Sequence, residues 1–248
     1  MERLIVFEGI DGSGKTSLSR MLHATLLEKG MEAVWLREPT DSPLGDKIRG
    51  IARDRESLSI REELEYFITD RRWDVENNIL PALRAGKTVI LDRYYYSNAC
   101  YQGARGLDME AILAMNREFA PEAELVFIID VDVDRALARI SSGRREVARL
   151  FEKKEFLEKV RANYHRLTGD NLVRIDGNAE LNAVMADVLR RYEEQQMKKA
   201  RPAAGLGRRS AANHLAGIAP QLVLLRALGQ RGRAHGQGRP AVGGRLQD

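Results

Sequence analysis

The sequence predicts an α/β fold built on a five-stranded parallel sheet with helices on both faces. Five short apolar segments alternate along the chain with longer segments of helical periodicity, which is the pattern of strand–helix–strand units. The apolar segments are continuous runs, as expected for parallel strands that are buried on both faces. Hydrophobic residues make up 44% of the chain, which is sufficient for a sizeable core.

The first predicted strand, LIVF at residues 4–7, leads directly into a glycine-rich loop. Residues 9–16, GIDGSGKT, fit the pattern G-x-x-x-x-G-K-S/T at every fixed position, and an apolar-periodic helix follows. In this context the glycines let backbone N–H groups turn toward phosphate oxygens, the lysine reaches the β- and γ-phosphates, and the hydroxyl residue ligates Mg²⁺. A glycine-rich turn without a ligand is the structural alternative. We expect a triphosphate site formed by Gly9, Asp11, Gly12, Ser13, Gly14, Lys15, Thr16 and Ser17.

The later elements follow from apolar runs, helical periodicity and turn residues. Further strands are predicted at residues 33–36, 88–91, 125–129 and 172–175. Further helices are predicted at residues 43–54, 59–83, 95–101, 108–119, 134–140, 151–167 and 179–195. Gly30 is expected to end the first helix, as glycine commonly does. Ser59 and Glu62 form a capping-box pattern at the start of the longest helix, and Pro81 is expected to bend or end its last turn.

The composition divides the chain into a body and a tail. Residues 197–248 contain ten Lys or Arg and one acidic residue, a net charge of +9, whereas the remainder carries −5. The tail is rich in Ala, Gly and Arg, so we expect it to be disordered. It lacks interleaved aromatic residues, which makes nucleic-acid binding a weaker hypothesis for the tail, and the acidic body gives no reason to expect it. We predict one domain at residues 1–196, with a polar, arginine-rich insertion at residues 141–150.

Several classes of protein are disfavoured by the composition. No run of about 18 apolar residues appears, so no membrane span is expected. The single cysteine, Cys100, excludes an intramolecular disulfide and is expected to be a small buried residue rather than a reactive thiol. Because the first strand begins at the N-terminus, no signal peptide is expected. These features predict a cytoplasmic protein.

Charged side chains follow the ends of four predicted strands. The first strand ends in the loop that contains Asp11, and others are followed by residues 37–39, 92–93 and 176–178. Ligands of open parallel sheets bind beyond the carboxyl ends of the strands. Four charged clusters at one edge of the sheet therefore indicate a binding site for charged ligands.

Five segments in a fixed order resemble the thymidylate kinase family, within the nucleoside monophosphate kinase group of P-loop kinases. These segments are EGIDGSGKTS, REPT, ELEYFITDRRW, LDRYYYSNACYQGARG and, after the arginine-rich insertion, LFEKKEFLEKVRANY. The resemblance covers about residues 3–194. It implies transfer of the γ-phosphoryl group of ATP to dTMP, with Mg²⁺, to give dTDP. It also implies a lid at residues 141–150 and a homodimer.

The resemblance assigns roles on the phosphate side of the site. Lys15 would act on the donor, and the Mg²⁺ ion would be held by Thr16, Asp11 and Asp92. Arg93 matches the family arginine that grips the acceptor phosphate, to which a planar guanidinium bonds bidentately. Asp11 resembles the family acid that faces the sugar and phosphate of the acceptor. A surface salt bridge between Arg93 and Asp92, and a turn-stabilising role for Asp11, are the structural alternatives.

Base recognition is expected from the long helix. Phe67 and Arg71 lie four residues apart and so project from one face. The resemblance implies that the phenylalanine stacks on thymine and that the arginine bonds to the edge of the ring. Spacing alone instead favours a core position for Phe67 and an ion pair of Arg71 with Glu63 or Asp74.

The segment SNACYQ supplies the other candidate base contacts. By resemblance, Asn98 and Tyr101 contact the pyrimidine and exclude a ribose 2′-hydroxyl, and Gln102 lies beside them. Periodicity alone also allows Tyr101 to be a half-buried packing residue. Glu38 is a weaker candidate for substrate binding, because a purely structural role in the turn after the second strand explains it nearly as well.

The arginines of the insertion complete the predicted site. Residues 10–13 of the phosphate loop contain no basic residue, whereas some thymidylate kinases carry one there. Transition-state charge must then be met from elsewhere, and we expect the lid to supply it, with Arg145 or Arg149 as the catalytic arginine. Arg139, just before the lid, is placed on the donor side. A solvated charged surface is the structural alternative for this run.

Two other functions remain open at this level. One is a P-loop kinase that acts on another nucleoside monophosphate, such as dUMP, UMP or CMP. The other is a non-catalytic nucleotide-binding module. A GTPase is disfavoured because the guanine-binding pattern N-K-x-D does not occur.

Overall fold

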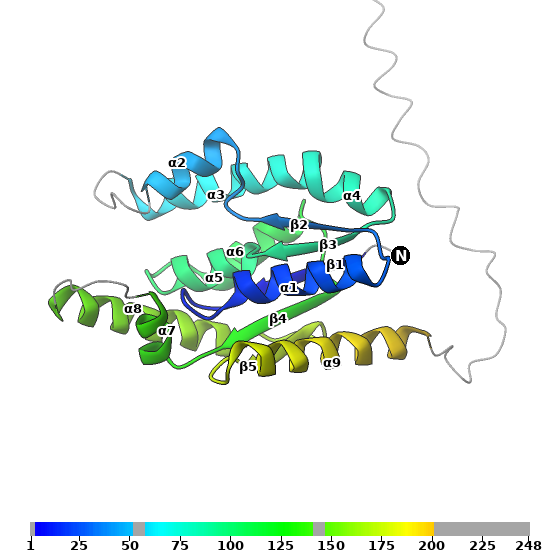
Figure 1. Cartoon of the computed structure of the whole chain (residues 1–248). Helices are drawn as coiled ribbons and strands as arrows, with labels where there is room; N and C mark the ends of the chain where they lie inside the picture. The colour runs from blue at the N-terminus through cyan, green and yellow to red at the C-terminus, as the bar shows by residue number, and fades with distance from the viewer. Residues whose placement is uncertain (1–2, 52–57, 141–146, 201–248) are drawn as a thin grey trace, which may run out of the picture. The chain divides into compact units, whose positions relative to one another are not determined.

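Five parallel strands form one sheet in the order β2-β3-β1-β4-β5 (Figure 1). The computed structural model describes residues 3–51, 58–140 and 147–200. The strands are β1 (Arg3–Glu8), β2 (Ala33–Arg37), β3 (Thr88–Asp92), β4 (Leu125–Asp130) and β5 (Leu172–Asp176). All four pairings are parallel, and β1 lies between β3 and β4. The predicted fold class is confirmed.

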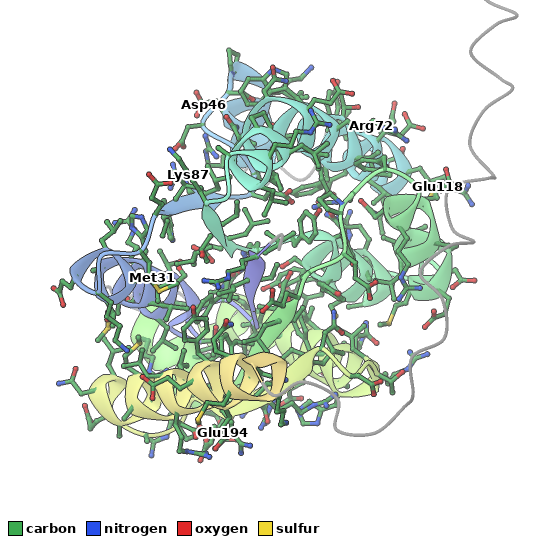
Figure 2. All side chains as sticks on the ribbon, turned by 90° about the vertical axis from the view of Figure 1, so that its right-hand side faces the viewer. Met31, Asp46, Arg72, Lys87, Glu118 and Glu194 are labelled. Carbon is green, nitrogen blue, oxygen red and sulfur yellow. The ribbon has the colours of Figure 1, made fainter. Side chains whose placement is uncertain are left out.

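Helices cover both faces of the sheet, and the sheet separates two apolar cores. Alternate residues of β1 enter different cores, because successive side chains of a strand point to opposite faces. Ile5 and Phe7 pack with the helices α1 (Lys15–Glu28) and α9 (Leu181–Ala200), whereas Leu4 and Val6 pack with the helices of the other face. Figure 2 shows α9, with Glu194, along the lower side of the molecule and the helices that carry Asp46 and Arg72 along the upper side.

The remaining helices agree with the predicted order. They are α2 (Pro43–Ile51), α3 (Ile60–Asp74), α4 (Leu80–Arg84), α5 (Tyr95–Gly103), α6 (Met109–Arg117), α7 (Val133–Ile140) and α8 (Val147–Arg166). The longest predicted helix is interrupted by a π-helical turn, η1 (Val75–Ile79), in which the N–H of Leu80 bonds to the carbonyl of Val75. This turn lies just before Pro81. A proline lacks the N–H that a regular helix needs, which fits an irregular turn at this point of the helix.

Two predicted helix boundaries differ from the structure by more than two residues, and a third lies outside the described residues. Helix α8 begins at Val147, so the last four residues of the predicted lid are helical and only residues 141–146 lie outside the described chain. Helix α9 continues to Ala200, four residues into the predicted tail, and residues 201–248 lie outside the described part. The predicted end of α2 beyond Ile51 is also outside it. The end of α9 is polar, so apolar periodicity gives no signal there, whereas residues 147–150 were assigned to the insertion because they follow an arginine-rich run.

Two predictions from composition are tested by the described residues. Within them, no helix is long and apolar enough to cross a membrane. Cys100 has an exposed fraction of 0% and lies in the core between α5 and its neighbours, and burial raises the pKa of its thiol well above the usual value. The prediction of a small buried cysteine is confirmed.

Candidate active site

The loop between β1 and α1 is shaped by glycines in the left-handed region. Gly12 has φ 81° and Gly14, the N-cap of α1, has φ 94°. A Cβ atom on Gly12 would lie 2.3 Å from the carbonyl oxygen of Ala136, so a side chain there is excluded by space as well as by conformation. The loop therefore passes close to α7 and directs its backbone toward the amino end of α1, which is a ready site for phosphate.

Lys15 and Thr16, the first residues of α1, face the end of β3. The ammonium group of Lys15 donates to the carbonyl of Ile10 at 3.2 Å, and burial, followed by the charge of Arg93, lowers its pKa to about 8. The hydroxyl of Thr16 donates to Asp92 Oδ2 at 2.6 Å. Among the described residues, the buried Oδ1 atom of Asp92 has no hydrogen-bond partner. A hydroxyl beside a carboxylate with one free oxygen fits the oxygen ligands that Mg²⁺ prefers.

Arg93 begins the turn between β3 and α5 and adopts a left-handed backbone with φ 71°. Its N–H bonds to the carbonyl of Phe7 at 2.9 Å, which ties the turn to β1. Its guanidinium donates to the Ser97 hydroxyl at 2.9 Å and forms an ion pair with Asp11. The ring of Tyr101 lies 5.2 Å from the guanidinium carbon, within the range of a cation–π contact. Arg93 is therefore paired with Asp11 and not with Asp92, the partner in the structural alternative.

Asp11 connects the phosphate loop to α5. Its N–H donates to the Tyr101 hydroxyl at 3.0 Å, and its carboxylate accepts a hydrogen bond from the Arg93 guanidinium. Burial acts to raise its pKa, but the charges of Arg93 and Lys15 outweigh this effect and hold the pKa below the usual value. The loop and the helix thus meet at an ionised carboxylate.

A cavity of about 210 Å³ opens beside Asp11 and Arg93. Its wall combines aromatic rings, polar side chains and two further arginines. It is lined by Asp11, Pro39, Ile48, Arg49, Glu63, Phe67, Arg93, Ser97, Asn98, Tyr101, Gln102, Arg105 and Phe156. A concave site with aromatic walls, a few polar groups and several arginines fits a small anionic molecule with a planar ring.

The polar wall of this cavity is ordered by a chain of side chains. The Asn98 amide donates to Gln102 and the Gln102 amide donates to Glu63, both at 3.4 Å, and Arg105 pairs with the same carboxylate. Within the described chain, the buried Oδ1 atom of Asn98 has no hydrogen-bond partner. A buried acceptor without a partner is costly, so this oxygen is available for a donor on a ligand.

Phe67 and Arg71 separate in the structure although they share one helix. Phe67 lines the cavity, whereas Arg71 is buried and is not among the lining residues described. The Arg71 guanidinium donates to Glu38 Oε2 at 2.8 Å and to Asn116 Oδ1 at 2.7 Å. Its ion-pair partner is therefore Glu38 and neither Glu63 nor Asp74. Glu38 is equally buried in this pair and does not reach the cavity wall.

A second, larger hollow of about 510 Å³ lies on the other side of the phosphate loop. It is lined by Gly12, Ser13, Gly14, Lys15, Thr16, Ser17, Leu18, Arg135, Arg139, Gly177, Ala179, Glu180, Leu181 and Val184. The guanidinium of Arg139 donates to the carbonyl of Gly177 at 3.0 Å and lies 3.4 Å from the carbonyls of Gly12 and Ser13. Arg139 thus bridges the phosphate loop and the turn after β5.

Several lining residues were not predicted individually. The turn after β5 contributes Gly177 and Glu180 to the larger hollow, and its position after a strand was the available signal. On the acceptor side, Phe156 comes from α8, and no pattern in the sequence indicates that this helix folds over the cavity. The predicted lid residues Arg144 and Arg145 lie outside the described chain, and of Arg149 only its place in the first turn of α8 is described.

Together the fold and the two hollows define a P-loop phosphotransferase whose acceptor is a small phosphorylated molecule. The family model for thymidylate kinase matches residues 7–188. The chain is 41% identical to a thymidylate kinase of Desulfotalea psychrophila over 77% of this chain and 95% of that one. It is 42% identical to a probable thymidylate kinase of Archaeoglobus fulgidus over 75% and 92%. A crystal structure of thymidylate kinase from Ehrlichia chaffeensis superimposes with a TM-score of 0.62 at 29% identity, over 77% of this chain and 98% of that one.

The chain belongs to the thymidylate kinase family. This confirms the family that the five segments of the sequence resemble.

Proposed function

We propose that the chain transfers the γ-phosphoryl group of ATP to dTMP and releases dTDP and ADP. One observation carries the proposal: the phosphate loop and the acceptor cavity meet at the pair of Asp11 and Arg93. A donor held by the loop and an acceptor held in the cavity would present their phosphates on either side of this pair. Phosphoryl transfer asks a protein mainly for such positioning and for neutralisation of charge.

On the donor side, the loop amides and Lys15 would bind the phosphates of ATP, and Arg139 would order the wall of the larger hollow. Thr16 and Asp92, together with Asp11 at the boundary of the two sites, are the residues that would hold Mg²⁺. Asp92 Oδ1, which has no hydrogen-bond partner in the part of the chain that the structure describes, supports this assignment together with the Thr16 hydroxyl beside Oδ2. When bound, the ion neutralises phosphate charge.

On the acceptor side, Arg93 would hold the phosphate of dTMP. Its guanidinium is already oriented by Asp11 and Ser97, so little ordering remains when the phosphate arrives, which favours binding. The ring of Tyr101, held beside the Asp11 backbone, would lie against the sugar and exclude a 2′-hydroxyl. We assign the remaining transition-state charge to the lid arginines Arg145 and Arg149.

The base would lie between Phe67 and the polar wall of α5. The Oδ1 atom of Asn98, which lacks a partner among the described residues, would accept the N3–H of thymine. Cytosine has an acceptor at this position, so the same oxygen would disfavour it. Gln102 would fix the Asn98 amide. We propose that Arg71, through its pair with Glu38, supports this wall from the core.

We further propose a homodimer that works in the cytoplasm, where ATP is available. Exposed apolar side chains on α3 and α6 support a covered surface: Trp73 is 46% exposed and Met115 is 39% exposed. Sedimentation velocity at micromolar concentrations would test this proposal, and a single species of monomer mass would contradict it.

Incubation with Mg-ATP and a panel of monophosphates tests the main proposal. We expect dTMP to be the best acceptor, dUMP to be weaker because it lacks the methyl group, and UMP and CMP to be poor. Thin-layer or ion-exchange separation of the products reports each diphosphate directly. If UMP or CMP reacts faster than dTMP, the proposal that dTMP is the acceptor is wrong. If no monophosphate reacts although ATP binds, the chain is a nucleotide-binding module.

A further inference from the structure

Glu8, the last residue of β1, is a fully buried carboxylate that lines neither hollow. Its exposed fraction is 0%, and an ionised group in such a place must be hydrogen-bonded to be tolerated. Both oxygens are in fact occupied. Oε1 accepts the N–H of Tyr94 at 2.8 Å and that of Ser97 at 3.2 Å, whereas Oε2 accepts the Ser97 hydroxyl at 2.6 Å and the Tyr164 hydroxyl at 2.8 Å.

The first two of these bonds cap helix α5 from another part of the chain. Tyr94 is the N-cap residue of α5 and its own side chain makes no capping bond in the described structure. The free N–H groups at a helix start need acceptors, and a negative charge there is favourable. Glu8, 86 residues earlier in the sequence, supplies the acceptor and the negative charge. It therefore fixes the position of the turn in which Arg93 lies.

The bond from the Ser97 hydroxyl to Glu8 Oε2 also orients the Arg93 side chain. The guanidinium of Arg93 donates to the oxygen of the Ser97 hydroxyl at 2.9 Å. That hydroxyl can accept from arginine only while its own hydrogen points elsewhere, and Glu8 Oε2 receives it. The carboxylate thus sets the direction of the hydroxyl, and the hydroxyl sets one of the contacts of the arginine.

The fourth bond connects the same carboxylate to α8. Tyr164 is 2% exposed, and its hydroxyl lies 3.1 Å from the Ser97 hydroxyl as well as 2.8 Å from Glu8. Helix α8 also contributes Phe156 to the wall of the acceptor cavity. A displacement of α8 would therefore move Arg93 through the contact between the Tyr164 and Ser97 hydroxyls and the hydrogen bond from Arg93 to Ser97.

We propose that Glu8 is a positioning residue for the acceptor phosphate: it holds Arg93 through Ser97 and the start of α5, and it couples Arg93 to α8 through Tyr164. The inference rests on the proposed transfer to dTMP, because the role of Arg93 is defined by that reaction. Glu8 itself touches neither substrate, so its effect is expected on the acceptor side and not on ATP.

The variant Glu8→Gln retains the shape of the side chain and removes the charge. We expect a rise of about tenfold to a hundredfold in the KM for dTMP or an equal loss of kcat, while the KM for ATP stays within about twofold. Tyr164→Phe, which removes one donor and leaves the carboxylate in place, is expected to act in the same direction by about threefold to tenfold. Tyr95→Phe is the matched control, since the Tyr95 hydroxyl is buried and bonds to Tyr96.

Combination with Arg93→Ala separates positioning from general loss of structure. If Glu8 acts through Arg93, then Glu8→Gln has little further effect on dTMP kinetics in the Arg93→Ala background. Full additivity of the two losses would overturn the proposal, as would equal changes in the ATP and dTMP constants of Glu8→Gln or Tyr164→Phe. The proposed function is judged separately by the wild-type protein with dTMP. Should Glu8→Gln fail to fold, Tyr164→Phe and its Tyr95→Phe control decide the question.

Discussion

Replacement of Arg93 by alanine and by glycine separates the charge of this residue from its backbone conformation. Both variants remove the guanidinium that contacts Asp11, Ser97 and Tyr101. Loss of one preorganised charge at a transition state typically costs about 2.7–4 kcal/mol, which is a factor of about 10² to 10³ in kcat. We expect this loss in both variants, because neither side chain can replace the cation.

The stability of the two variants should differ although their turnover does not. Arg93 has φ 71°, and a left-handed backbone costs a non-glycine residue about 1–2 kcal/mol. Glycine avoids this cost but loses about 0.5–1 kcal/mol more conformational entropy on folding than alanine. The net difference of about 1 kcal/mol in favour of Arg93→Gly corresponds to about 2–4 °C in Tm for a unit of this size.

Initial rates at saturating Mg-ATP and dTMP measure kcat, and circular dichroism during heating measures Tm. Calorimetric titration with ATP is the control, and both variants should bind it within about threefold of wild type, since the phosphate loop keeps its glycines and Lys15. Turnover within about threefold of wild type in either variant would refute the role of Arg93. A much larger loss in Arg93→Ala than in Arg93→Gly would show that the backbone, and not the charge, is what matters.

Four further predictions concern the donor side and the tail. The pKa of Lys15 in the folded protein is lowered to about 8, below its value in the unfolded chain. The free energy of unfolding of the ligand-free protein should therefore increase as the pH rises from about 8 to about 10.5. Denaturant unfolding across this pH range measures the increase, and a free energy of unfolding that does not change with pH would contradict it. ATP restores the charged lysine, so its binding at pH 8 should take up protons, as calorimetry in two buffers would show, and Lys15→Arg should abolish the uptake. Asp92→Asn should raise the Mg²⁺ concentration for half-maximal rate by about tenfold or more, and an unchanged Mg²⁺ dependence would exclude Asp92 as a ligand. Deletion of residues 201–248, which lie beyond the match to the family model, should leave kcat and Tm unchanged; a loss of either would show that the tail belongs to the catalytic unit.

The strands were predictable because their burial on both faces leaves continuous apolar runs. Each predicted strand lies within an observed one, and the alternation of strands and helices was enough to give a parallel sheet. The order of the strands was not predictable from such runs, because it depends on which crossovers pack. The start of α8 and the end of α9 were also missed: residues 147–150 were assigned to the insertion, and α9 continues through polar residues without any change in pattern.

The site was predictable where a residue's role follows from its place at a strand end. Asp11, Asp92 and Arg93 are brought together as expected because their strands are neighbours. The position of the Arg71 side chain was not predictable, because helical spacing cannot show that its guanidinium points into the core toward Glu38. Glu8 was overlooked although a signal existed: a carboxylate at the end of an apolar strand must be buried if that strand is central.

The pairing of β1 with β3 sets the distance between the start of the phosphate loop and the turn that contains Arg93. Phe7 and Asp92 are partners in this register, so the phosphate loop and the Arg93 turn leave the sheet side by side. Neighbouring strands are held about 4.8 Å apart by their hydrogen bonds. Backbone hydrogen bonds therefore fix the separation at which these two turns leave the sheet, and the surrounding helices can change it only slightly. A slip of one residue between these strands would shift one turn by about 3.3 Å and turn Asp92 to the opposite face, so the reaction is tied to the register of a single strand pair.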